Sequence, residues 1–298
     1  MALVSIARHG YSAAGGNMDG VPPQGRGGSR GWSKRSRKSN EEFLQSIDFH
    51  GLSGIPYAVT LTLPTTRTPD STEFHAMLKA YLMRLKRYGA IRWHWLIEWT
   101  MKHQPHTHMV VWAPADWIFF EVDARVMWLE IAKKHGFECR LTAQDVKRVT
   151  SVGWLQYVAK HGAKSVHAAQ RENLPAVGWE TPGRVWGYGP RSAWPSKATR
   201  EPMRFDLPQP AFWRLRRLCR SYAIAQARLS RHDDGYSARI RAARRMLQAP
   251  KEQSPYRGCS GWVPEDVMLT YLNMLMDEGY NVEQVEKTRD DDGHVKYL

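Results

Sequence analysis

Two histidines one residue apart, His106 and His108, are the side chains of this sequence best suited to chemistry. They lie in a run rich in β-branched and aromatic residues, Pro-His-Thr-His-Met-Val-Val-Trp, which predicts a strand. Because successive side chains of a strand point to opposite faces, both imidazoles project on one side and Thr107 on the other. Such a pair can chelate a divalent ion if a third ligand comes from a neighbouring strand.

Glu98 is the candidate for that third ligand. Residues 92–99 alternate, with Glu98 on the face opposite three tryptophans, and the short connection 100–104 lets the two runs pair as an antiparallel hairpin. Glu98 then lies on the side of His106 and His108. One carboxylate and two imidazoles leave coordination positions open for a substrate, as in a catalytic metal site. His94 is about 13 Å from Glu98 along the strand, which is too far to share one ion.

A candidate nucleophile follows in residues 154–161. This run predicts a helix that begins after Thr150 or Ser151 and ends at Gly162. Tyr157 and Lys160 are three residues apart and therefore share one helix face. The pattern predicts a phenol hydroxyl beside a cation.

Three segments in this order resemble the motifs of the HUH endonucleases: Thr-Leu-Thr-Leu-Pro at 60–64, Pro-His-Thr-His at 105–108, and the tyrosine helix at 154–160. Within these enzymes the chain is most similar to rolling-circle replication initiators of single-stranded DNA phages and plasmids. Residues 183–187, Gly-Arg-Val-Trp-Gly, are similar to a box found in many filamentous-phage-like initiators. The resemblance covers roughly residues 57–188.

Two positions depart from the pattern of these enzymes. Thr107 replaces the bulky hydrophobic residue between the histidines; since threonine favours strands and points away from the ion, we regard the change as harmless. His161 stands where some relatives carry a second tyrosine, which favours a single-tyrosine mechanism.

The resemblance implies a site-specific endonuclease and ligase that nicks and rejoins single-stranded DNA at a replication origin. Tyr157, assisted by Lys160, would form a 5′-phosphotyrosyl intermediate by metal-dependent transesterification. His106, His108 and Glu98 would hold a divalent cation, Mg²⁺ or Mn²⁺. The expected partners are the origin strand and the helicase, polymerase and single-strand-binding protein of a bacterial host, in its cytoplasm.

Tryptophans and arginines interleave in residues 163–200. This mixture suits stacking on unpaired bases and binding of phosphates, although a loop packed by its own tryptophans would explain the same residues. We assign Arg184, Trp186, Lys164 and Arg191 to DNA binding.

Composition favours a globular protein with a polyanionic partner. The chain has 298 residues, 42% of them apolar, and a formal charge of +14. Nucleic acid is the obvious polyanion, an inert basic surface being the alternative. Three scattered cysteines predict neither disulfides nor a zinc ribbon, and no apolar run reaches the roughly 20 residues of a membrane span.

The chain is expected to have three regions. Residues 1–45, rich in Gly, Ser and Arg, predict a disordered basic arm that either tracks phosphates or is a plain tail. Residues 46–198 would form the nickase domain, an α+β fold with a ferredoxin/RRM-like antiparallel sheet and flanking helices. Residues 199–298 predict a helical, basic C-terminal region, with a terminal hairpin over 282–298. No helicase P-loop is present, so unwinding would come from another protein.

Other functions fit parts of this pattern. An HUH transposase or relaxase would use the same chemistry. Two histidines and a glutamate also describe a zinc hydrolase, in which Tyr157 would only pack. A ferredoxin-like fold can also be a non-catalytic nucleic-acid-binding module, with the histidines as buried core groups.

Overall fold

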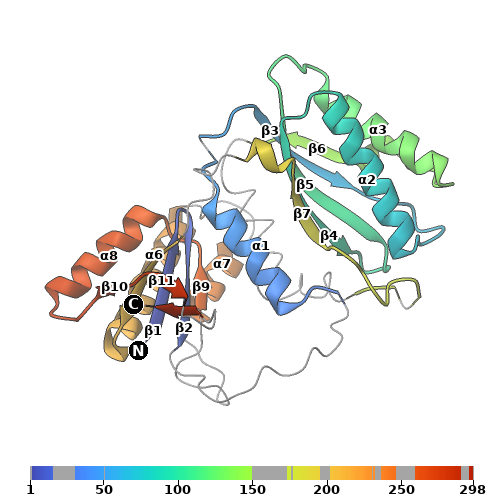
Figure 1. The fold of residues 1–298 in the computed structure, drawn as a ribbon. Helices are drawn as coiled ribbons and strands as arrows, with labels where there is room; N and C mark the ends of the chain where they lie inside the picture. The colour runs from blue at the N-terminus through green and yellow to red at the C-terminus, as the bar shows by residue number, and fades with distance from the viewer. Residues whose placement is uncertain are drawn as a thin grey trace. The chain divides into compact units, whose positions relative to one another are not determined.

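The computed structural model describes residues 2–15, 31–49, 51–149, 173–175, 177–194, 202–229, 231, 236–245, 259–289 and 295–297. The chain divides into two units, each with its own antiparallel sheet (Figure 1). One unit combines Met1–Pro23, Gln45–Ile47 and Arg200–Leu298, and the other combines Gln24–Leu44 and Asp48–Thr199. The predicted α+β class, with antiparallel sheets and flanking helices, is confirmed. Within the described ranges, no helix has both the length and the apolar character needed to cross a membrane.

The second unit contains the segments with the candidate chemistry. Its helices and strands, in chain order, are α1 (Lys34–Ser46), β3 (Ile55–Leu61), α2 (Ser71–Arg87), β4 (Arg92–Trp99), β5 (Pro105–Ala113), α3 (Phe120–Lys134), β6 (Asp145–Arg148) and β7 (Trp186–Gly189). The sheet order is β6-β3-β5-β4-β7, and all neighbouring strands are antiparallel. From β3 to β6, the strand-helix-strand-strand-helix-strand order and the pairing of the last strand with the first are those of a ferredoxin-like sheet.

Helix α2 shows how the local sequence sets these elements. Asp70 precedes the helix, and its Oδ1 accepts the backbone N–H of Glu73 at 2.7 Å, which satisfies one of the free donors of the first turn. The buried residues recur at helical spacing and form one apolar stripe: Phe74, Met77, Leu78, Tyr81 and Leu85. This stripe fixes α2 against the sheet, next to α3 (Figure 1).

The two faces of this sheet have different coverings. Helices α2 and α3 lie together on one face of the sheet (Figure 1). Trp99 of β4 points to this face, where it contacts Trp179 and, through it, Phe74 of α2. Tyr57 of β3 contacts Phe120 of α3. The other face carries His94, and α1 packs against it: the Phe43 ring stacks on His94 at 5.7 Å between centroids, and Asn40 Oδ1 lies 2.7 Å from His94 Nε2. The histidine-bearing face is therefore the one that α1 partly covers.

Glycines make the close pairing of the edge strand β7 possible. A Cβ atom added to Gly187 would lie 2.9 Å from the Trp95 ring, and one added to Gly189 would lie 3.2 Å from the Trp93 ring. Between the glycines, Tyr188 points to the other face and stacks on Phe43 at 4.3 Å. Strand β7, Trp-Gly-Tyr-Gly, thus alternates space for tryptophans on one face with aromatic side chains on the other.

The first unit is built from both ends of the chain. Its elements are β1 (Ala2–Ala7), β2 (Gly10–Gly15), β8 (Met203–Leu207), α6 (Gln209–Leu229), α7 (Tyr236–Arg245), β9 (Cys259–Gly261), α8 (Glu265–Asp277), β10 (Glu283–Gln284) and the paired β11 (Lys287–Arg289) and β12 (Val295–Tyr297). The sheet order is β10-β8-β1-β2-β9. The terminal hairpin predicted in 282–298 is confirmed, but the supposedly helical region also supplies strands to this sheet.

The prediction of a disordered arm over residues 1–45 is wrong for the described residues 2–15 and 31–45. Alternate residues of β1, Ala2, Val4 and Ile6, are fully or almost fully buried, and β1 lies between β2 and β8. Trp32 is buried as well, and its Nε1 donates to the carbonyl of Ile97 at 2.8 Å. The average composition of the segment hid short apolar patterns whose partners lie far away in the sequence.

Candidate active site

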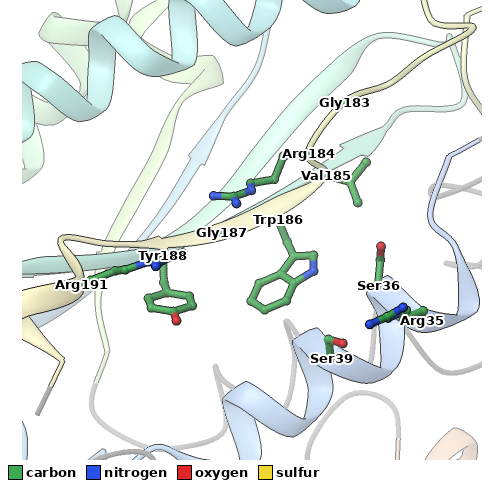
Figure 2. Close-up of a pocket in the computed structure, with 10 residues that line it drawn as sticks. All are labelled: Arg35, Ser36, Ser39, Gly183, Arg184, Val185, Trp186, Gly187, Tyr188 and Arg191. Atoms are coloured by element: carbon green, nitrogen blue, oxygen red, sulfur yellow. The ribbon is translucent and has the colours of Figure 1, made fainter. Parts of the chain in front are cut away.

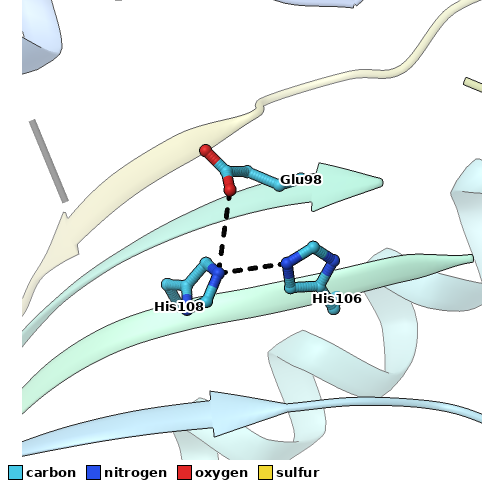
Figure 3. Close-up of side chains that lie close together, drawn as sticks. All are labelled: Glu98, His106 and His108. Atoms are coloured by element: carbon cyan, nitrogen blue, oxygen red, sulfur yellow. Dashed lines mark hydrogen bonds and ion pairs between the residues drawn. The ribbon is translucent and has the colours of Figure 1, made fainter. Parts of the chain in front are cut away.

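The ladder between β4 and β5 brings the three predicted ligands together. Glu98 lies directly opposite His106, as the predicted hairpin requires, and Leu96 lies opposite His108. Directly paired residues of antiparallel strands share a face, and His106 and His108 share a face by alternation. Figure 3 shows the Glu98 carboxylate and both imidazoles turned toward one another above the two strands.

The ligand-bearing atoms of the three side chains converge on one point. His106 Nε2 lies 3.0 Å from His108 Nε2, and His108 Nε2 lies 3.7 Å from Glu98 Oε2 (Figure 3). One ligand atom from each residue lies within 4.8 Å of the others. All three residues are buried, Glu98 completely. Burial of a carboxylate is costly unless positive charge or hydrogen-bond donors lie beside it, so the cluster favours a cation.

Thr60 of β3 orients the cluster from the third strand. It lies opposite His108 in the ladder, and its Oγ1 is 3.0 Å from His108 Nδ1. An imidazole that binds a metal through Nε2 carries its proton on Nδ1 and donates it to a neighbouring oxygen. Thr60 is placed to accept that proton, which leaves the Nε2 lone pair directed at the cluster.

The residues fit a divalent cation. Two ligands about 2.1 Å from an ion and 90° apart lie about 3.0 Å from each other, which is the separation of the two Nε2 atoms. Two imidazole nitrogens and one carboxylate oxygen suit Mn²⁺ or Zn²⁺ well and Mg²⁺ less well, since Mg²⁺ prefers oxygen ligands. Three protein ligands leave positions for a substrate oxygen or water.

The predicted nucleophile and its neighbours lie outside the described residues. Tyr157, Lys160 and Lys164 belong to the segment 150–172, so their assignments remain predictions from the sequence.

The remaining predicted DNA-binding residues line one cavity. Arg184, Trp186 and Arg191 come from β7 and its flanks, and together with Arg35 and Ser39 of α1 they line a cavity of about 400 Å³ (Figure 2). Figure 2 shows Trp186 and Tyr188 projecting from β7 toward the helix. The structure thus separates two groups of functional candidates on the same unit, namely the buried Glu98, His106 and His108 cluster and a basic, aromatic cavity.

Other histidines of the hairpin take structural positions. His94 bonds to Asn40 and stacks on Phe43. His103 lies in the turn between β4 and β5, where its Nδ1 is 3.2 Å from the carbonyl of Asn173.

Arg35 and Ser39 of the cavity are not among the DNA-binding residues predicted from the sequence. The prediction assigned them to a disordered arm, whereas the structure places them in α1. A local signal for this helix exists: Ser33 Oγ accepts the backbone N–H of Ser36, a helix N-cap, and the apolar pair Phe43 and Leu44 follows two turns later.

Sequence comparison relates the chain to known replication-associated proteins. Residues 56–166 match a family of replication-associated proteins described under the name ORF2. The replication-associated protein of Pseudomonas phage Pf3 is 36% identical over 260 residues, which cover 84% of this chain and 87% of that protein. A protein of Xylella fastidiosa strain 9a5c, whose name assigns it provisionally to replication, is 35% identical over 302 residues, covering 95% and 99%.

No solved structure matches the chain. The family match covers β3 to β6, with the Glu98, His106 and His108 cluster inside it, and the similarity to the phage protein extends over most of the chain. The chain therefore belongs to the ORF2 family of replication-associated proteins, the phage-type initiators of rolling-circle replication.

Proposed function

We propose that this initiator nicks and rejoins single-stranded DNA at a replication origin by transesterification on Tyr157. The observation that carries the proposal is the convergence of Glu98, His106 and His108 in a member of this family. In the first step a bond forms between the Tyr157 oxygen and the scissile phosphorus, and the bond from phosphorus to the 3′-oxygen breaks. The tyrosine loses its proton, and the departing 3′-oxygen gains one.

The chemistry needs help from its surroundings, because a tyrosine of ordinary pKa near 10 is only about 0.1% ionised at pH 7, a deficit of roughly 4 kcal/mol. A divalent cation held by Glu98, His106 and His108 would polarise the phosphate and stabilise the charge of the transition state. Lys160, one helical turn from Tyr157, would favour the phenolate or bind a phosphate oxygen. Thr60 keeps the His108 ring in its orientation.

The step exchanges one phosphoester for another, so it is readily reversed. Reversal at the same site would rejoin a circle after replication. The free 3′-hydroxyl would prime a host polymerase, with a helicase and a single-strand-binding protein of the host keeping the template open. We place this work in the bacterial cytoplasm, where those partners act.

Replacement of one ligand tests the proposal. His106→Ala should abolish Mn²⁺-dependent cleavage of a labelled single strand that carries the origin. His103→Ala is the matched control, because His103 lies in the same hairpin but contacts Asn173 rather than the cluster. Undiminished nicking by His106→Ala, or by the unaltered protein in excess chelator, would show that no metal at this cluster takes part.

A zinc hydrolase that acts on peptides or esters is the alternative function from a different class of enzyme. It predicts zinc in the purified protein and ester hydrolysis that Tyr157→Phe leaves unchanged. The same pair of variants, His106→Ala and Tyr157→Phe, therefore separates the two functions: nicking requires both residues and hydrolysis requires only the first.

A further inference from the structure

The cavity between α1 and β7 has the composition of a nucleotide site. Its walls carry three arginines, two aromatic rings and two serines, and no lining residue is acidic: Arg35, Ser36, Ser39, Arg184, Trp186, Tyr188 and Arg191 (Figure 2). Its volume, about 400 Å³, lies within the range of roughly 300–1,000 Å³ typical of small-ligand sites.

Three arginines line the cavity without a counter-ion. Within the described residues, none of Arg35, Arg184 and Arg191 forms an ion pair or side-chain hydrogen bond, and all three are exposed. Like charges gathered around a cavity repel one another, and an anion bound between them removes that cost. Guanidinium groups bind phosphate and carboxylate oxygens in pairs of parallel hydrogen bonds. In a replication-associated protein, the phosphates of DNA are the anions that such a wall would meet.

The aromatic wall is held in place before any ligand binds. Tyr188 stacks on Phe43 at 4.3 Å, and the Phe43 ring stacks in turn on the buried His94. Trp186 lies against the same group, 5.9 Å from Phe43, yet its ring remains partly exposed. A fixed and partly exposed indole offers a face on which any base can stack. Packing between α1 and β7 explains Tyr188 and Phe43 but not the three arginines.

We propose that this cavity binds one unstacked nucleotide of single-stranded DNA, with its base against Trp186 and its phosphates between Arg35, Arg184 and Arg191. The serine hydroxyl of Ser39 is available to bond a base edge or a phosphate. This site adds residues of α1 to the DNA-binding residues predicted from the sequence. Together they form a discrete pocket rather than a basic loop.

The sheet fixes where this nucleotide lies relative to the metal cluster. Trp186 pairs with Leu96, and Leu96 pairs with His108, so two strand spacings of about 4.8 Å separate Trp186 from His108. That distance, about 10 Å, corresponds to about three stacked nucleotides at ~3.4 Å each. If the proposed nicking occurs at the cluster, the pocket holds a nucleotide that flanks the scissile phosphate. Only this position relative to the scissile phosphate rests on the proposed function; binding of a nucleotide in the pocket does not.

Binding of fluorescein-labelled dT12 to the full chain, in chelator so that no cleavage occurs, tests the pocket. Fluorescence anisotropy should show a Kd about tenfold higher for Trp186→Ala with dT12, but a change below twofold with a twelve-unit abasic strand of equal charge. Arg35→Ala should weaken both probes and lower the salt slope by about 0.7. Lys38→Ala removes the same charge from the same helix outside the cavity, and should change neither Kd more than twofold.

Two further measurements keep the result interpretable. Trp186→Phe retains a ring and should bind dT12 within about threefold of the unaltered protein, while circular dichroism shows that Trp186→Ala is folded. Equal losses with dT12 and the abasic strand, or equal effects of Arg35→Ala and Lys38→Ala, would overturn the pocket. Base-dependent binding without nicking would count against the proposed function alone, and nicking without base-dependent binding against the pocket alone.

Discussion

Thr60 lies directly opposite His108 on the neighbouring strand, and its Oγ1 is 3.0 Å from Nδ1 of that histidine. The contact comes from β3, which carries none of the three predicted ligands. It therefore depends on the register of β3 as well as on that of the β4–β5 hairpin. It links the Thr-Leu-Thr-Leu-Pro segment at 60–64 to the cluster of Glu98, His106 and His108.

Removal of this hydroxyl should weaken metal binding. Thr60→Val keeps the shape of the side chain and the strand preference but deletes the acceptor for Nδ1–H, so the affinity for Mn²⁺ should fall about 10–100-fold. Calorimetric titration with Mn²⁺ measures this directly, and Thr60→Ser should restore most of the affinity. Equal Mn²⁺ affinity in Thr60→Val and the unaltered protein would mean that the contact does not position His108.

The cluster could be predicted from sequence because every step of its construction is local. Two residues of spacing place His106 and His108 on one face, and a five-residue connection fixes Glu98 opposite His106. The cap of helix α2 is equally local, since Asp70 and Glu73 form it within one turn. In such patterns the pairing of residues follows from their spacing in the sequence, so it can be predicted without knowing any distant partner segment.

The first unit could not be predicted in the same way. Strand β1 pairs with β8, about two hundred residues later, so that its burial depends on a partner that no local pattern reveals. Arg35 was missed for the same reason: its cavity exists only because α1 packs against β7. The average composition of the first 45 residues is dominated by Gly, Ser and Arg. It does not reveal that Val4 and Ile6 alternate with less buried residues, as they do in strand β1.

Ile6→Ala tests whether the N-terminal strand is part of a folded core. Ile6 is 1% exposed and belongs to the core of the first unit, so the loss of its side chain should cost about 2–5 kcal/mol of unfolding free energy. Hydrogen–deuterium exchange should show lost protection in peptides from β8 and α6 but not from β5. Ser5→Ala, on the other face of the strand, is the control. Unchanged exchange in Ile6→Ala would restore the disordered-arm interpretation.

Cys139 should react slowly with alkylating reagents. Burial raises the pKa of its thiol to about 11, because the thiolate loses solvation, and its Sγ lies 3.7 Å from the carbonyl of Thr62. Only about 0.1% is then thiolate at pH 8, against about a quarter of a free cysteine with pKa near 8.5. The rate of iodoacetamide labelling, followed by peptide mass spectrometry, should rise about tenfold per pH unit from pH 7 to 10. Labelling of Cys139 at pH 8 as fast as that of free cysteine would contradict this environment.

The most direct measurement is the location of a covalent DNA adduct on the chain. After incubation with an origin-bearing single strand and Mn²⁺, nuclease trimming and trypsin should leave a nucleotide on the peptide 149–160, whose single tyrosine is Tyr157. Tyr157→Phe should bind the strand about as tightly and form no adduct. An adduct on any other peptide, or one that persists in Tyr157→Phe, would contradict the proposed chemistry.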